Sequence, residues 1–274
     1  MLHERIDVRV EGSLAEAHAD TYIIDHGNEL PVGNRPLIVI CPGGGYRMTS
    51  NRESELVALN LCAMGYHTVV LRYSVAPSRY PTALMELGKL VACLKDRAEE
   101  WHISRDHIAV MGFSAGGHLA CSYGEMWREP WLSEALGVTP EALRPTGMVL
   151  CYPVITSGAY AHDGSFRYLL GDRYEELKDS LSLENRVTDA VPPTFLWHTF
   201  EDGSVPVQNS LLLASALAEH RIPVEFHLFQ PGGHGLSLAN RLVRSGSGWV
   251  DLPDVARWMS LLHAWLERWC RDIV

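Results

Sequence analysis

Short apolar stretches recur along the chain, and segments of helical length separate them. Their continuous apolar side chains are typical of strands that are buried on both faces of a sheet. These strand-like stretches are 37–41, 68–73, 107–112, 148–152, 194–198 and 224–229. The helix-like segments between them include 53–64, 81–101, 115–127 and 207–220. The alternation indicates βαβ units and predicts an α/β protein with a mainly parallel sheet.

The last part of the chain predicts a helix with one apolar side. Its apolar residues recur at near-helical spacing, and they are Val255, Trp258, Leu262, Trp265 and Trp269. This side is expected to pack against the core, since an aromatic stripe at that spacing serves packing more often than ligand binding. Just before it, the small residues Ser245 to Gly248 predict a flexible surface loop.

Length and composition favour one large domain over residues 1–274, because 274 residues with 47% hydrophobic side chains can fill a sizeable core. The connection from Pro153 to Pro193 is far longer than an ordinary one. We therefore expect an insertion there that forms a small cap over a site.

The formal net charge of −10 repels phosphate backbones and anionic lipid surfaces, which argues against nucleic-acid and membrane partners. The acidic N-terminal residues form no apolar signal region, and no segment has the length of a membrane span. These features lead us to expect a soluble cytoplasmic protein.

The 6 cysteines are scattered through apolar stretches without C-x-x-C spacing. This pattern argues against a zinc knuckle or a redox motif. We expect most of them to be small buried hydrophobes, with disulfides as the less favoured alternative. Cys41 would rival a serine nucleophile only if basic neighbours lowered its pKa.

A G-x-S-x-G pattern spans Gly112 to Gly116 and has Ser114 at its centre. It follows a predicted strand and precedes a helix-like segment, which is the context of a nucleophile elbow. In such an elbow a strand turns sharply into a helix and projects the serine from the end of the sheet. Patterns of this length also occur by chance, so the partners of Ser114 decide its role.

A serine nucleophile needs a neutral imidazole that takes its proton. His234 lies in a glycine-rich loop directly after the last predicted strand, at the sheet edge where α/β sites are found. His227 lies within that strand, His263 lies off the apolar side of the terminal helix, and His118 is constrained by its own helix. His234 is therefore the candidate base.

The base in turn needs an acid that fixes its tautomer. Asp202 follows the predicted strand 194–198, again at a carboxyl end of the sheet. Glu201 beside it is the nearest competitor, and an exposed loop charge is the alternative for either residue. Asp202 is favoured because its place completes the chain order Ser, Asp, His.

The developing oxyanion requires donors that are already in place. The glycines from Gly43 to Gly45 follow the first predicted strand, and glycine lets backbone N–H groups approach a substrate closely. We expect donors from Gly44 or Gly45 and from the N–H of Ala115. Tyr46 is expected to shape the substrate pocket, with a packing wall as the alternative. The loop lacks the lysine of a phosphate-binding loop, and a simple tight turn is the remaining interpretation.

Several of these segments together resemble one family. They are 42–46, 72–77, 112–120, 197–202 and 232–235. In this order they resemble the α/β-hydrolase serine esterases of the acetylxylan esterase-like or BD-FAE-like carbohydrate esterase family, over about residues 37 to 240. The resemblance implies an α/β-hydrolase fold and a serine carboxylesterase without metal or organic cofactor.

The same resemblance places the triad on Ser114, Asp202 and His234 and the oxyanion hole on the glycine loop. Arg72, Tyr73 and His198 also belong to the resembling segments, and we interpret them as scaffold. The loop departs from the His-Gly-Gly of many related hydrolases, which leaves both Gly44 and Gly45 as candidate donors.

The hypothesis that follows is an esterase that removes a short acyl group, acetyl first of all, from a carbohydrate or another small alcohol. Its partner would be a small-molecule or oligosaccharide ester. Amidases, peptidases and formamidases of the same fold use the same triad, so the leaving group stays open. A hydrolase-fold binding protein without turnover is the alternative from another class, and the complete Ser, Asp, His set argues against it.

Overall fold

The computed structural model describes residues 1–27, 29, 33–244 and 251–271. The loop expected from Ser245 to Gly248 lies outside the described residues. Among the helices of the described part, none is long and apolar enough to cross a membrane.

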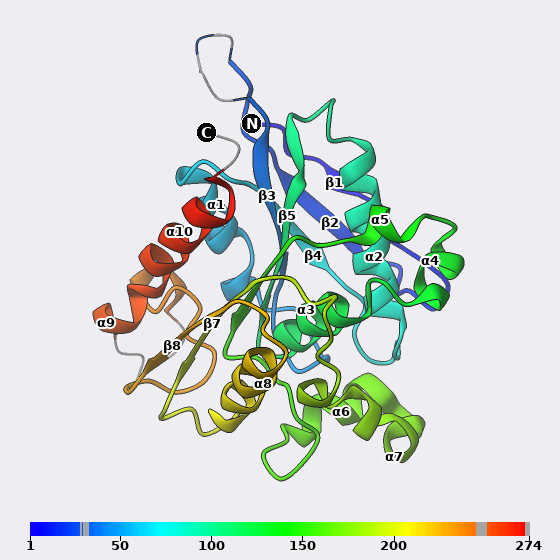
Figure 1. Ribbon diagram of the computed structural model, residues 1–274, viewed down its shortest axis with the longest axis vertical. Helices are drawn as coiled ribbons and strands as arrows, with labels where there is room; N and C mark the ends of the chain where they lie inside the picture. Colours follow the sequence, from blue (N-terminus) through cyan, green and yellow to red (C-terminus); the bar gives the residue numbers. More distant parts are fainter. Residues whose placement is uncertain (28, 30–32, 245–250, 272–274) are drawn as a thin grey trace.

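An 8-stranded sheet forms the centre of the molecule (Figure 1). Its order is β1-β2-β4-β3-β5-β6-β7-β8. The parallel strands are β3 (Arg35–Cys41), β4 (His67–Arg72), β5 (Ile103–Phe113), β6 (Gly147–Cys151), β7 (Thr194–Thr199) and β8 (Val224–Phe229). They coincide with the apolar stretches of the sequence, and β6 and β7 are buried along their whole length. The prediction of a mainly parallel sheet is confirmed.

Two further strands extend one edge of the sheet in the antiparallel direction. β1 (Arg5–Ile6) pairs with β2 (His18–Tyr22), and β2 pairs with β4. Neither has a continuous apolar run, because β1 is very short and β2 alternates between buried and partly exposed positions. The apolar pattern of the sequence therefore did not predict them.

Helices cover both faces of the sheet (Figure 1). One face carries α1 (Glu55–Ala63), α9 (Pro253–Ala256) and α10 (Trp258–Trp269), whose Leu61, Trp258 and Leu262 share a core with β-strand residues such as Ile38. The other face carries α2 (Thr82–Asp96), α3 (Ala115–Met126) and α8 (Gln208–Glu219). The shorter α4 (Pro130–Leu136) and α5 (Pro140–Leu143) lie beside α2.

The apolar side of the terminal segment packs into the core as predicted. Val255, Trp258 and Leu262 are fully buried and Trp265 nearly so, while Trp269 is partly buried against the same cluster. The segment is not one continuous helix, because α9 ends at Ala256 and α10 begins at Trp258.

The long connection between β6 and β7 contains α6 (Asp163–Leu170), α7 (Tyr174–Leu177) and short 3-10 turns. Phe166 and Leu169 of α6 belong to the same core cluster as the α3 side of the sheet. The start of this connection is tied to α8, because the buried Asn209 accepts hydrogen bonds from the backbone N–H groups of Ile155 and Thr156.

Candidate active site

Ser114 lies at the sharp turn between β5 and α3. Its backbone has φ 54° and ψ −119°, a left-handed region that residues with a side chain rarely adopt. The flanking glycines make this turn possible, since a Cβ at Gly112 would collide with the carbonyl oxygen of Gly116. A Cβ at Gly116 would collide with the carbonyl oxygen of Cys41. The strand–turn–helix context expected for the elbow is thus present.

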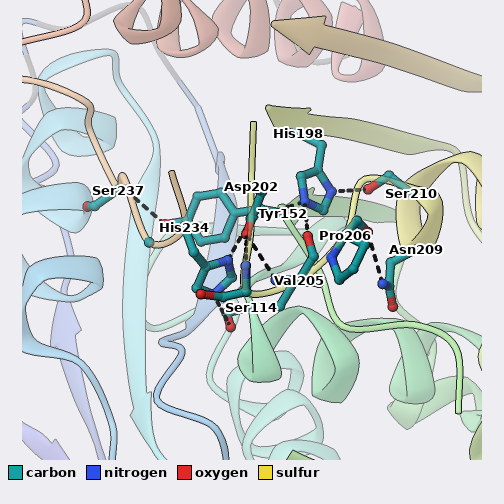
Figure 2. A network of polar contacts seen from close by, with 12 residues as sticks. Ser114, Tyr152, His198, Asp202, Val205, Pro206, Asn209, Ser210, His234 and Ser237 are labelled. Carbon is teal, nitrogen blue, oxygen red and sulfur yellow. Dashed lines mark hydrogen bonds and ion pairs between the residues drawn. The ribbon is translucent and has the colours of Figure 1, made fainter. Parts of the chain in front are cut away.

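His234 and Asp202 meet Ser114 at the carboxyl ends of the strands (Figure 2). The Ser114 Oγ lies 2.7 Å from the His234 Nε2, and the His234 Nδ1 lies 2.6 Å from an Asp202 carboxylate oxygen. His234 comes from the loop after β8 and Asp202 from the loop after β7. The structure therefore brings together the three residues that the sequence singled out.

The surroundings of Asp202 keep it ionised although it is buried. Burial raises the pKa of this carboxyl, but hydrogen bonds from His198 and His234 outweigh burial, and the net effect lowers the pKa well below its usual range. Its second oxygen accepts from the backbone N–H groups of Ser204 and Val205, each at 2.9 Å. An ionised Asp202 accepts a hydrogen bond from the N–H at the His234 Nδ1, which leaves the Nε2 lone pair free for Ser114.

His198 supports the acid from the opposite side (Figure 2). It is fully buried, its Nδ1 lies 2.7 Å from the Ser210 hydroxyl, and its Nε2 lies 3.2 Å from Asp202 and 3.0 Å from the Val205 carbonyl oxygen. Glu201, the competing acid, is exposed and accepts instead from the N–H of Gly232. Asp202 is thus the carboxylate in contact with His234.

The glycine loop presents free backbone donors beside Ser114. Gly43 is not one of them, because its N–H donates to the Glu53 carboxylate at 2.8 Å. The N–H groups of Gly44, Gly45 and Ala115 have no hydrogen-bond acceptor among the described residues. Gly44 and Gly45 both have positive φ, and a Cβ at Gly44 would collide with the Met48 carbonyl oxygen. The two candidate donors of this loop stay Gly44 and Gly45.

The expectation that Tyr46 shapes the pocket is wrong. Its side chain is 3% exposed, its hydroxyl lies 2.9 Å from the His118 Nδ1, and its ring packs against Tyr73. The backbone of Tyr46 has φ 57°, and the side chain is turned into the core on the α3 side of the sheet. Tyr46 is therefore a packing wall behind the loop.

A buried polar network connects the loops that carry the site, and the sequence did not reveal it. Glu53 is 4% exposed, and its second oxygen accepts from the Tyr152 hydroxyl at 2.6 Å. The same hydroxyl accepts from the N–H of Ser237 at 2.8 Å, and the Tyr152 ring lies 5.2 Å from the ring of His234. Glu53 thus links the glycine loop to the loop that carries His234. Its sequence signal was weak because it was part of a helix-like segment.

A cavity of about 450 Å³ opens over Ser114 and His234. It is lined by Gly44, Gly45, Arg47, Met48, Ser50, Arg52, Glu53, Ser114, His162, Gly164, Tyr168, Ser204, His234 and Gly235. A larger hollow of about 840 Å³ lies beside Lys95 and Cys93, but neither a serine nor a histidine lines it. We therefore place the candidate site at the smaller cavity, where the nucleophile and the base meet.

The cysteines do not compete with Ser114. All of them are free, and all but the partly exposed Cys93 are buried. Burial raises the pKa of the Cys41 thiol well above its usual range, so it is not a thiolate at neutral pH. Among the residues that the structure describes, no group of three or more His, Cys, Asp or Glu side chains could hold a metal ion.

Comparison with known proteins places the chain among esterases. The BD-FAE family model matches residues 28–217. The acetylxylan esterase of Xylanibacter ruminicola is 30% identical over 241 residues, which are 83% of this chain and 46% of that relative. The chain spans about a third to a half of the length of the first curated relatives that it matches.

Solved structures match over almost their whole length. The acetyl ester-xyloside bifunctional hydrolase from Caldicellulosiruptor lactoaceticus is 35% identical with a TM-score of 0.80, and the match covers 97% of this chain and 96% of the other. The carboxylesterase Cest-2923 from Lactobacillus plantarum WCFS1 is 30% identical with a TM-score of 0.84 and covers 98% of both chains. With its mainly parallel sheet, its elbow serine and the match of the family model, the chain belongs to the BD-FAE family of α/β-hydrolase esterases.

Proposed function

We propose that the protein is a serine carboxylesterase that removes short acyl groups, above all acetyl, from a carbohydrate alcohol. The observation that carries the proposal is the continuous chain of contacts from Ser114 through His234 to Asp202. The names of two relatives, an acetylxylan esterase and an acetyl ester-xyloside hydrolase, support the choice of acyl group and alcohol.

Acylation begins when the His234 Nε2 takes the proton of the Ser114 hydroxyl. The Oγ then forms a bond to the ester carbonyl carbon, and the carbonyl electron pair moves onto its oxygen. The N–H groups of Ala115 and of Gly44 or Gly45 stabilise this oxyanion. When the tetrahedral intermediate collapses, the bond to the alcohol oxygen breaks, and His234 gives its proton to the departing alkoxide.

Deacylation repeats the same steps with water. His234 takes a proton from a water molecule, whose oxygen attacks the acyl-enzyme carbonyl and releases the carboxylic acid and the Ser114 hydroxyl. Asp202 keeps accepting the hydrogen bond from the His234 Nδ1–H throughout, so the imidazolium formed in each half-reaction stays paired with a carboxylate.

The nucleophile can be tested with a serine-directed phosphonate and mass spectrometry. We expect one adduct on Ser114 in the folded protein and none in Ser114→Ala, whose turnover should fall by at least about 10³-fold. Ser133→Ala, in α4 and outside the lining of the cavity, is the matched control and should keep its activity. Equal turnover by the native protein and by Ser114→Ala would refute the mechanism in which Ser114 is the nucleophile.

The substrate class needs a separate comparison. Acetylated xylo-oligosaccharides should be hydrolysed with a higher kcat/KM than simple acetyl, butyryl, octanoyl and feruloyl esters. A preference for the longer or aromatic acyl groups would overturn the acetyl assignment and leave the serine mechanism in place.

A further inference from the structure

His162 forms part of the wall of the cavity and has no role in the triad. It lies directly before α6, in the connection between β6 and β7, and lines the same cavity as Ser114 and His234. The side chain is half-buried. His234 lines the same cavity, and burial and then a charge on His234 lower the pKa of His162.

Hydrogen bonds at the start of α6 fix which nitrogen of His162 carries the proton. The Nδ1 caps the helix, because it accepts from the backbone N–H of Ser165 at 3.3 Å and lies 2.8 Å from the Ser165 hydroxyl. A backbone N–H only donates, so the Nδ1 carries a lone pair. Burial, and then the charge of His234, lower the pKa of His162, which favours the neutral ring. The proton of this neutral ring is therefore on the Nε2.

The Nε2–H of His162 is an unused donor. It has no hydrogen-bond acceptor among the described residues, and it is not one of the side-chain nitrogens sealed from solvent. Arg47 and Tyr168 line the same cavity, so the cavity carries several polar groups. Such a cavity suits an alcohol that is rich in oxygen atoms better than an alkyl group.

The segment that carries His162 is held at both ends. Before it, the Asn209 amide of α8 donates to the carbonyl oxygen of Tyr160 at 2.9 Å. After it, the C-terminal part of α6 accepts hydrogen bonds from Arg79 at Tyr168 and from Tyr80 at Leu169, each at 2.9 Å. A donor fixed in this way can orient a ligand with a small loss of side-chain entropy.

We propose that His162 is a substrate-binding residue whose Nε2–H donates to an oxygen of the sugar alcohol, either a hydroxyl or the ring oxygen. The proposal rests on the esterase function above. The alcohol leaves toward His234, since His234 protonates it, and His162 lines the cavity into which the alcohol departs. The alcohol class is thus one with an acceptor oxygen close to the ester, as in a partly acetylated pyranoside.

The test compares His162→Asn with the native protein on two acetyl esters. Asparagine is a good N-cap, so its side-chain oxygen can keep the bond from the Ser165 N–H, while its shorter amide leaves no donor at the position of the His162 Nε2. The substrates are an acetylated methyl xyloside and cyclohexyl acetate, whose alcohol has a similar ring without further oxygen atoms. The ratio of the two kcat/KM values should fall roughly 5- to 10-fold, which is the loss of one neutral hydrogen bond.

His162→Ser is a second variant that also caps the helix and should give the same ratio. An unchanged ratio in both variants, whether activity falls equally on the two esters or not at all, would overturn the role of His162. The proposed function is tested by the native protein alone. If the native protein does not prefer the xyloside ester to cyclohexyl acetate, the sugar assignment is refuted, and so is the binding role of His162. A preference without a change of ratio in the variants would refute the binding role alone.

Discussion

The Tyr152 hydroxyl joins two loops that must keep their positions for the site to work. It donates to Glu53, which holds the N–H of Gly43, and it accepts from Ser237 beyond His234. Tyr152→Phe should lower kcat roughly 10- to 100-fold with little change in KM, because the oxyanion donors and the base lose their alignment. Steady-state kinetics and urea unfolding would measure this, with an expected stability loss of about 1–3 kcal/mol.

Tyr66→Phe is the matched control for this residue. The Tyr66 hydroxyl also bonds to a glutamate, Glu267 at 3.0 Å, but Tyr66 packs under α10 and does not line the cavity. This variant should lose stability and keep kcat. If kcat fell equally in the two variants, the effect of Tyr152→Phe would be explained by a general loss of stability. That result would refute the positioning role of Tyr152.

The elbow depends on two elements that approach each other at glycine. The start of α3 lies against the end of β3, where a Cβ at Gly116 would collide with the carbonyl oxygens of Cys41 and Pro42. Gly116→Ala should therefore shift the elbow, lower the melting temperature and reduce kcat/KM more than about 100-fold. Gly33→Ala is the control, since no heavy atom of the described residues, apart from its neighbours in the chain, lies within 4 Å of its added Cβ. Full activity of Gly116→Ala would contradict the tight packing at this turn.

The strands that carry the site were predictable, while the directions of several side chains were not. Burial gives the C-terminal half of β5 and the middle of β7 an apolar run, and a parallel sheet then delivers Ser114 and Asp202 to one edge. Tyr46 sits beside the loop glycines in sequence, but its positive φ turns it into the core. The role of Glu53 could not be predicted from the sequence, because a buried carboxylate is recognised by its hydrogen-bond partners. The partners of Glu53 are Gly43 and Tyr152, which are distant from it in the chain.

At the scale of the whole molecule, the site depends on contacts between distant parts of the chain. Arg52, which follows the glycine loop, donates to the carbonyl oxygens of Gly235 at 2.7 Å and Val243 at 2.9 Å. The segment after the glycine loop is thus bound to the segment after β8, and both segments line the cavity of the site. The site therefore forms only in the folded chain. Conditions that lower the stability of the domain will therefore also remove the site.

Buried histidines predict how that stability depends on pH. Burial lowers the pKa of His118 from 6.5 to about 4, and that of His67 likewise to about 4. In both rings the Nδ1 is engaged as an acceptor, from the Tyr46 hydroxyl in His118 and from the Ile24 N–H in His67. Between pH 6.5 and pH 4 the unfolded chain binds these protons and the folded chain does not, so stability falls as the pH is lowered through this range.

For His118 alone the loss should approach about 3 kcal/mol near pH 4. Burial also raises the pKa of Glu86 and Glu125. The folded chain therefore binds these two protons more readily than the unfolded chain does, so the two carboxyls increase the stability as the pH falls. A comparison with His118→Asn separates the two effects, because the carboxyls are common to both proteins. Urea unfolding at pH 7, 6 and 5 should give the variant a lower stability at pH 7 but a smaller loss toward pH 5. Parallel curves for the two proteins would mean that His118 does not stay neutral in the folded core.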